Sequence, residues 1–290
     1  MRILHSKFFP TFGVYKEIFV GLLTEKFSWK VLPDSRISKL PTLFLKKVAL
    51  ILRNLRNLRR TKEKLIRNTY LHARRKMRRI EFELRRIQEE LSLGVRYVIG
   101  INVEGDIAEF GTQYGISCRY ICQAMRDYGT IKNIHLFDSF IGLPAITATE
   151  DIESPEIRSG TWSEGAFQGI STNKLREIAG RYLREESIHI YKGWFNDSLS
   201  LIPAGTKFAM VHVDCDLYKS ASEVLTYLFE NRIISEGCII YFDDYNCNKA
   251  SPDFGERKAW AEAIEQFCIN YSDGGSYSWG GHKFFIHSYK

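Results

Sequence analysis

Beyond residue 100, short apolar runs alternate with stretches whose apolar residues recur every three or four positions. Runs rich in β-branched and aromatic side chains are typical of buried strands, and the three-and-four spacing is typical of helices. The predicted strands are 105–111, 133–139, 187–193, 207–216, 237–244 and 282–289, and the predicted helices are 115–129, 172–183, 220–233 and 255–270. This alternation predicts an α/β fold, in which right-handed crossovers place helices on both faces of a parallel sheet.

A different pattern precedes this region. Residues 42–92 contain no proline or glycine, and helix-forming residues dominate. An apolar heptad seam runs through Tyr70, Ala73, Met77, Ile80, Leu84, Ile87 and Leu91. A seam of this length is close to the lower limit for predicting a coiled coil. We therefore expect a basic and aromatic N-terminal segment (1–41), a basic helical arm that could form a coiled coil (42–93) and an α/β domain (94–290).

Charge also separates the arm from the domain. The whole chain carries a net charge of +7, with 24 Lys and Arg against 8 Asp and Glu in residues 1–100, but 17 against 26 in residues 101–290. Two interpretations of the arm remain open. In one, the helix packs its apolar stripe on its own domain or on a twin subunit, which would give a homo-oligomer. In the other, it docks on a polyanion, either an anionic membrane surface or a nucleic acid.

The cellular compartment follows from two simpler features. No segment reaches the ~18–20 consecutive apolar residues that a membrane-spanning helix requires. The six cysteines form no Cys-x-x-Cys pair, and Cys118 and Cys122 are spaced as packing residues on a predicted helix. These features predict reduced thiols in a cytoplasmic protein.

Acidic and aromatic residues follow five consecutive predicted strands at the point where each strand ends. These positions are Glu109, Asp138, the segment 193–195, the pair Asp214 and Asp216, and the pair Asp243 and Asp244. Because the carboxyl ends of parallel strands meet at one rim, where α/β proteins bind ligands, we expect these side chains to share a site. Gly111 and Gly115 would let the first turn approach a ligand closely. Asp138 suits either hydrogen bonds from ribose hydroxyls or an Asx cap on the following turn.

The four aspartates need a reason to be close together. Carboxylates crowded without partners raise one another's pKa values and cost stability. A hard divalent cation removes that cost, because Mg²⁺ favours carboxylate and water oxygens. Helix caps and Asx turns could account for one or two of these acids, but hardly for the whole group. The group therefore predicts a magnesium site.

Five segments, in order over about residues 100–290, resemble the macrocin O-methyltransferase family: GDIAEFGTQYG, FDSFIGLP, YKGWFNDSL, VHVDCDLYKS and IIYFDDYN. The resemblance implies a class I, Rossmann-like methyltransferase sheet of about seven strands with the last strand antiparallel. It implies an S-adenosylmethionine site at Glu109, Gly111, Gly115, Ser117, Asp138, Ser139, Trp194 and Phe195. It also implies Mg²⁺ on Asp214, Asp243 and Asp244.

The expected reaction is transfer of a methyl group to a hydroxyl of a sugar, glycan or glycosylated natural product. Asp216 is the first candidate for the general base and His282 the second. Related catechol-type enzymes carry a lysine where this chain has Leu217, which weighs against a phenolic acceptor. Two alternatives stay open: a nucleic-acid methyltransferase that uses the basic arm, although no [DN]PP[YF] motif is present, and a non-catalytic assembly protein.

Overall fold

The computed structural model describes the backbone of residues 42–290, with the side chains of residue 64 and residues 67–290. The expected segment 1–41 lies outside the described residues. Helix α3 (Thr42–Gly100) comes first, and the chain divides into two compact units between Phe82 and Glu83. Helix α3 thus spans the arm expected over 42–93 and continues to Gly100, and the second unit begins at Glu83. The expected domain boundary at residue 94 stays a prediction.

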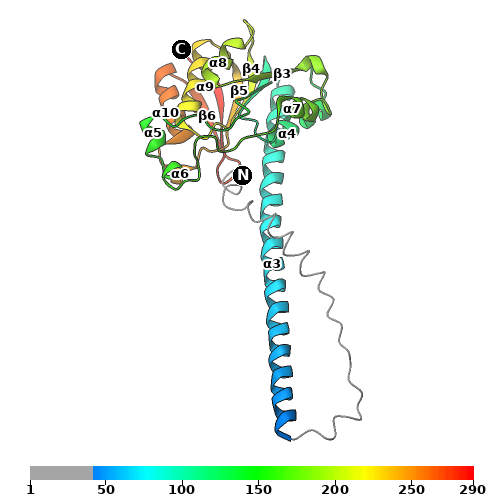
Figure 1. Cartoon of the computed structure of the whole chain (residues 1–290). Coiled ribbons are helices and arrows are strands. Elements are labelled where there is room, and N and C mark those ends of the chain that lie inside the picture. Colours follow the sequence, from blue (N-terminus) through cyan, green and yellow to red (C-terminus); the bar gives the residue numbers. More distant parts are fainter. Residues whose placement is uncertain (1–41) are drawn as a thin grey trace. The chain divides into compact units, whose positions relative to one another are not determined.

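A seven-stranded sheet forms the centre of the second unit (Figure 1). Its strand order is β3-β2-β1-β4-β5-β7-β6. The bounds are β1 (Asp106–Phe110), β2 (Ile134–Asp138), β3 (Ile188–Lys192), β4 (Phe208–Val213), β5 (Ile234–Phe242), β6 (Asn270–Ser276) and β7 (His282–Ser288). Strands β1 to β5 pair in parallel, whereas β7 is antiparallel to both β5 and β6. The predicted fold class is confirmed, including the antiparallel last strand.

Strand β6 is the one strand of the sheet that the sequence pattern missed. Its residues, NYSDGGS, are polar and glycine-rich, and most of them are exposed. It lies at the edge of the sheet and pairs only with β7 among the described strands. An edge strand of this kind has no buried face to impose an apolar alternation, so it leaves no periodic signal.

Two apolar cores lie on opposite faces of the sheet, because successive residues of a strand point to opposite sides. On β1, Ile107 belongs to one core and Ala108 to the other. Helices α9 (Tyr218–Glu230) and α10 (Gly255–Phe267) supply buried residues to the core that contains Ala108. Helices α4 (Ile116–Asp127) and α7 (Thr172–Ala179), with the end of α3, supply the other. Helices therefore cover both faces, as predicted.

The last turns of α3 are an integral part of the second unit. Ile87, Leu91 and Val95 are buried in the core beside β1. The hydroxyl of Tyr241 on β5 donates a hydrogen bond to the carbonyl oxygen of Glu90 at 3.0 Å, and the Glu90 carboxylate pairs with Lys283 on β7. The C-terminal part of the heptad seam thus packs on the chain's own sheet.

Shorter elements complete the second unit. The long connection from β2 to β3 carries α5 (Thr149–Ile152) and α6 (Pro155–Arg158) before α7, and α8 (Phe195–Ser198) follows β3. All six cysteines are free, as predicted. Among the helices of residues 42–290, none is long and apolar enough to cross a membrane.

Candidate functional site

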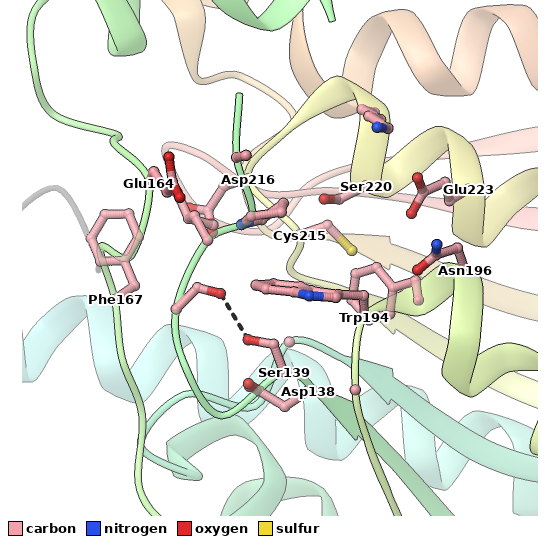
Figure 2. Close-up of a pocket in the computed structure, with 18 of the residues that line it drawn as sticks. Asp138, Ser139, Glu164, Phe167, Trp194, Asn196, Cys215, Asp216, Ser220 and Glu223 are labelled. Carbon is pink, nitrogen blue, oxygen red and sulfur yellow. Dashed lines mark hydrogen bonds between the residues drawn. The ribbon is translucent and has the colours of Figure 1, made fainter. Parts of the chain in front are cut away.

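A cavity of about 440 Å³ opens where the parallel strands of the sheet end. Its lining comes from the ends of four strands: Gly111 after β1, Asp138 and Ser139 at the end of β2, Gly193–Asn196 after β3 and Asp214–Asp216 after β4 (Figure 2). The β2–β3 connection adds Gly142–Ala145, Thr147, Glu164 and Phe167. The expected convergence of strand ends at one rim is therefore present for β1 to β4.

Asp138 holds the glycine turn and its own turn together. One carboxylate oxygen accepts hydrogen bonds from the backbone N–H groups of Thr112 (2.7 Å) and Gln113 (2.9 Å) and from the Thr112 hydroxyl (3.1 Å). The other oxygen accepts from the N–H of Phe140 at 2.7 Å. Four protein donors match the acceptor capacity of a carboxylate. Of the two roles expected for Asp138, the structure displays the turn-organising one.

The glycines of this turn meet different requirements. Gly111, at φ 91°, and Gly115, at φ 67°, adopt left-handed backbone conformations that other residues rarely tolerate. Only Gly111 lines the cavity. A Cβ on Gly115 would lie 3.1 Å from Leu175 of α7, so its smallness serves the packing of α4 against α7.

The two aromatic residues after β3 point in different directions. Trp194 lines the cavity and lies across its centre in Figure 2. Phe195 touches the lining but packs against the core, where its ring meets Phe110 edge-on at 5.9 Å between centroids. Trp194 therefore offers an aromatic surface to a planar ligand, and Phe195 holds the same segment against the core.

Three residues that were expected in the donor site do not line the cavity: Glu109, Gly115 and Ser117. Glu109 is fully buried, and its Oε1 lies 3.1 Å from Nδ1 of His212 on the adjacent strand β4. Burial lowers the pKa of His212, but the hydrogen bond and charge of Glu109, together with the charges of Asp243 and Asp214, outweigh burial and raise that pKa. Sequence reasoning missed His212, whose only signal was a polar residue inside an apolar strand.

Two of the four aspartates line the cavity and two do not. Asp214 and Asp216 line the cavity, and both are buried. Asp243 and Asp244 follow the adjacent strand β5 but do not line the cavity. Asp243 accepts a hydrogen bond from the hydroxyl of Tyr277 at 3.2 Å, and Asp244 accepts one from the thiol of Cys247 at 3.2 Å.

Glu256 is a fifth acid at this position, and the sequence pattern did not reveal it. It lies in the first turn of α10 and is fully buried. Its two oxygens accept the backbone N–H groups of Cys215 at 3.0 Å and Asp244 at 2.9 Å. Burial, followed by the charge of Asp244, raises the pKa of Glu256 well above its usual value. One carboxyl group thus ties together the two strand ends that carry the aspartates.

The donor set suits a hard cation in its chemistry, because the groups near one another at these strand ends are carboxylates. The charges of Asp243, Glu256 and Asp214 add to burial in raising the pKa of Tyr277, which is the crowding that a dication would relieve. Among the described side chains (residue 64 and residues 67–290), however, no three His, Cys, Asp or Glu residues are grouped as a metal site requires.

The two candidate bases differ in their surroundings. Asp216 lines the cavity and adopts a left-handed φ of 63°. His282 starts β7 at the same rim, but its Nε2 lies 2.7 Å from Asp273, its Nδ1 lies 3.0 Å from Ser276, and its ring stacks on Tyr245. It does not line the cavity. Position therefore favours Asp216.

The β2–β3 connection is held against the site by contacts that cross the sequence. Asp151 of α5 is buried and accepts the N–H groups of Tyr218 (2.7 Å) and Lys219 (3.1 Å) at the start of α9. It caps a helix that has no side-chain cap of its own. Lys219 also donates to the hydroxyl of Thr147 at 3.2 Å, and both residues line the cavity.

Comparison with known proteins agrees with these features. The family model described as macrocin-O-methyltransferase matches residues 77–270. Demethyldecarbamoylnovobiocin O-methyltransferase of Streptomyces niveus is 30% identical over 159 residues, which is 54% of this chain and 59% of that relative. This chain therefore spans less than two thirds of that relative's length.

Two solved structures show the same fold. The O-methyltransferase NovP aligns with a TM-score of 0.59 and 24% identity, covering 70% of this chain and 80% of NovP. A calicheamicin methyltransferase aligns with a TM-score of 0.54 and 20% identity, covering 69% of this chain and 77% of that chain.

Proposed function

The chain belongs to the macrocin-O-methyltransferase family, and from this premise we propose that it methylates a hydroxyl group of a sugar, glycan or glycosylated natural product. The methyl donor is S-adenosylmethionine. The observation that carries the proposal is the cavity at the strand ends, which joins a glycine turn, an aromatic wall and carboxylates in one space. The relative from Streptomyces niveus, whose name gives demethyldecarbamoylnovobiocin as its substrate, supports the choice of a natural-product acceptor.

The donor would lie along the β1, β2 and β3 ends of the cavity. Gly111 allows close approach of the backbone, and Trp194 offers an aromatic face for the adenine. Asp138 and Ser139 hold the turns that form this wall, since Ser139 donates to the carbonyl of Gly142 at 2.8 Å (Figure 2). Glu109, Gly115 and Ser117 would act from behind the wall.

The acceptor would lie toward the β4 and β5 ends. Asp214, Asp243 and Asp244 would hold Mg²⁺, and Glu256 keeps the backbones that carry them at a set separation. When bound, the donor supplies an electrophilic methyl group and Mg²⁺ supplies a Lewis acid that lowers the pKa of a hydroxyl. Asp216 would accept the proton of the acceptor hydroxyl. Glu164, Lys219 and Thr147 form a polar wall suited to an acceptor with several hydroxyl groups.

The test begins with calorimetric titration of S-adenosylmethionine into the full chain, with and without Mg²⁺. It continues with methyl transfer from labelled donor to a panel of glycosides and free sugars. We expect donor binding in both conditions, and transfer to a glycoside that stops with EDTA and returns with added Mg²⁺. Absence of donor binding at millimolar concentration would refute the methyltransferase assignment. Full methyl transfer in EDTA would refute only the proposed Mg²⁺ dependence.

A further inference from the structure

The part of α3 in the first unit is strongly basic. Residues 42–82 hold 14 Lys and Arg against 2 Glu, for a net charge of +12. Where side chains are described, the basic residues are mostly exposed: Lys64, Arg67, Arg74, Arg75, Arg78 and Arg79. The acidic character of the cavity and the basic character of this helix therefore belong to different units.

The same helix also exposes an apolar face. Tyr70, Ala73 and Met77 follow the three-and-four spacing that places residues on one side of a helix. Tyr70 is 62% exposed and Met77 is 48% exposed. With about 100° of rotation per residue, Arg74 and Arg78 lie beside this seam, whereas Arg75 and Arg79 lie on the opposite side of the helix. The described turns of the first unit thus present an apolar stripe flanked by cations.

Three occupants could cover this face: a second copy of the chain, a nucleic acid, or a lipid surface. A second copy would bring two helices, each of net charge +12, to the ~8–10 Å separation of packed helices. This separation is about one Debye length at physiological ionic strength, so salt would screen their repulsion only in part. A nucleic acid would satisfy the charge but would leave Tyr70 and Met77 without an apolar environment. An anionic bilayer satisfies both, because headgroups attract the cations while the acyl boundary takes up the apolar side chains.

We propose that residues 64–82 of α3 form a docking surface for an anionic lipid membrane, on which the helix lies without spanning it. The exposed arginines supply the attraction to the headgroups, and the Tyr70 and Met77 face enters the interface. This proposal concerns the first unit alone and does not depend on the methyltransferase assignment.

The charge arm of the test uses co-sedimentation of the full chain with vesicles of phosphatidylglycerol and phosphatidylcholine in equal parts, and with vesicles of phosphatidylcholine alone. We expect binding to the anionic vesicles only, weakening with added salt. The variant R74E/R78E, at the two exposed arginines beside the seam, should bind at least ~10-fold more weakly. The control R181E/R184E makes the same change in net charge at two exposed arginines beside α7, and it should bind like the wild type.

The apolar arm uses Y70S/M77S, with I131S/I152S as a control that removes exposed apolar side chains from the second unit. We expect a clear loss of anionic-vesicle binding in the first pair and none in the second. Unchanged binding of Y70S/M77S would reduce the interaction to general charge attraction and overturn the proposal. The proposal would also be overturned if the wild type bound anionic vesicles more weakly than it bound duplex RNA. A particle mass that doubles without lipid, and returns to one copy in Y70S/M77S, would assign the face to a second copy instead.

Discussion

Oε1 of Glu109 lies 3.1 Å from Nδ1 of His212, across the two central strands of the sheet, and both side chains are almost completely excluded from solvent. The sequence pattern placed Glu109 in the donor site, where its carboxylate would meet the ligand. The structure instead pairs it behind the cavity wall, where it compensates a buried histidine.

This pair predicts that Glu109→Ala destabilises the protein by about 2–4 kcal/mol, because it leaves His212 buried without its partner. Glu109→Gln keeps an acceptor oxygen and should lose less. Urea unfolding measures both. In a His212→Ala background, Glu109→Ala should cost clearly less than in the wild type, and an equal cost would show that the two residues are not coupled.

Glu256 leads to a second prediction, because it accepts two backbone N–H groups from two different strand ends. Glu256→Ala should cost about 2–4 kcal/mol of stability, through the unsatisfied donors and the cavity it leaves. Glu256→Gln retains one acceptor and should be intermediate in stability. If the carboxylate also sets the spacing of the aspartates, Glu256→Gln should require more Mg²⁺ for half-maximal turnover while its donor affinity stays unchanged. The same Mg²⁺ requirement as the wild type would limit Glu256 to a structural role.

Asp138 and Trp194 should separate the organisation of the donor site from contact with the donor. Asp138→Asn replaces acceptors with an amide N–H₂ that faces backbone N–H groups, so stability and donor affinity should fall together, each by about 1–3 kcal/mol. Trp194→Ala should weaken binding of the donor while leaving the free energy of unfolding nearly unchanged. Calorimetry and urea unfolding on the same preparations test this, and a stable Asp138→Asn variant that binds poorly would favour direct contact with the donor instead.

The carboxylates at the β4 and β5 ends should divide into metal-holding and proton-accepting groups. Asp243→Asn or Asp244→Asn should abolish turnover but leave donor binding nearly intact. Asp216→Asn should leave the Mg²⁺ requirement in place and lower kcat by about 10²–10⁴, the usual contribution of a general base. His282→Gln should have a small effect on kcat, because its imidazole is engaged by Asp273 and Ser276 outside the cavity. A larger loss of kcat in His282→Gln than in Asp216→Asn would reverse the assignment.

Acid stability should depend on Asp106 at the start of β1. Burial raises its pKa, but hydrogen bonds from His135 and Asn133 outweigh burial and hold the pKa of Asp106 at about 2, below its ordinary 3.8. Its ionised form therefore stabilises the fold above pH 3.8, and this contribution is lost as the pH falls toward 2. Asp106→Asn should cost about 1–2 kcal/mol at pH 7 after solvent screening. The difference in the free energy of unfolding between Asp106→Asn and the wild type should shrink as the pH falls from 3.8 to 2, as urea unfolding at several pH values would measure. A difference at pH 2 as large as at pH 7 would contradict this prediction.

Much of the fold and the rim of the site could be predicted from local patterns. Period-two and three-and-four spacings mark strands and helices because burial of one face requires them, and parallel strands must end at a common edge. The convergence of Gly111, Asp138, Trp194 and Asp214 on one cavity follows from that geometry. These features can be predicted without knowing which distant segment of the chain each residue contacts.

What only the tertiary structure decided depends on partners far apart in the sequence. Glu256 reaches Cys215 across 41 residues and Glu109 reaches His212 across 103, so no local spacing marks either contact. Strand β6 is specified by its pairing with β7, since its exposed polar residues carry no apolar period. The heptad seam of α3 is continuous in sequence, yet Leu91 packs in the core while Met77 remains exposed. An apolar stripe shows that a surface can be buried, but the surface that covers it is selected by the rest of the fold.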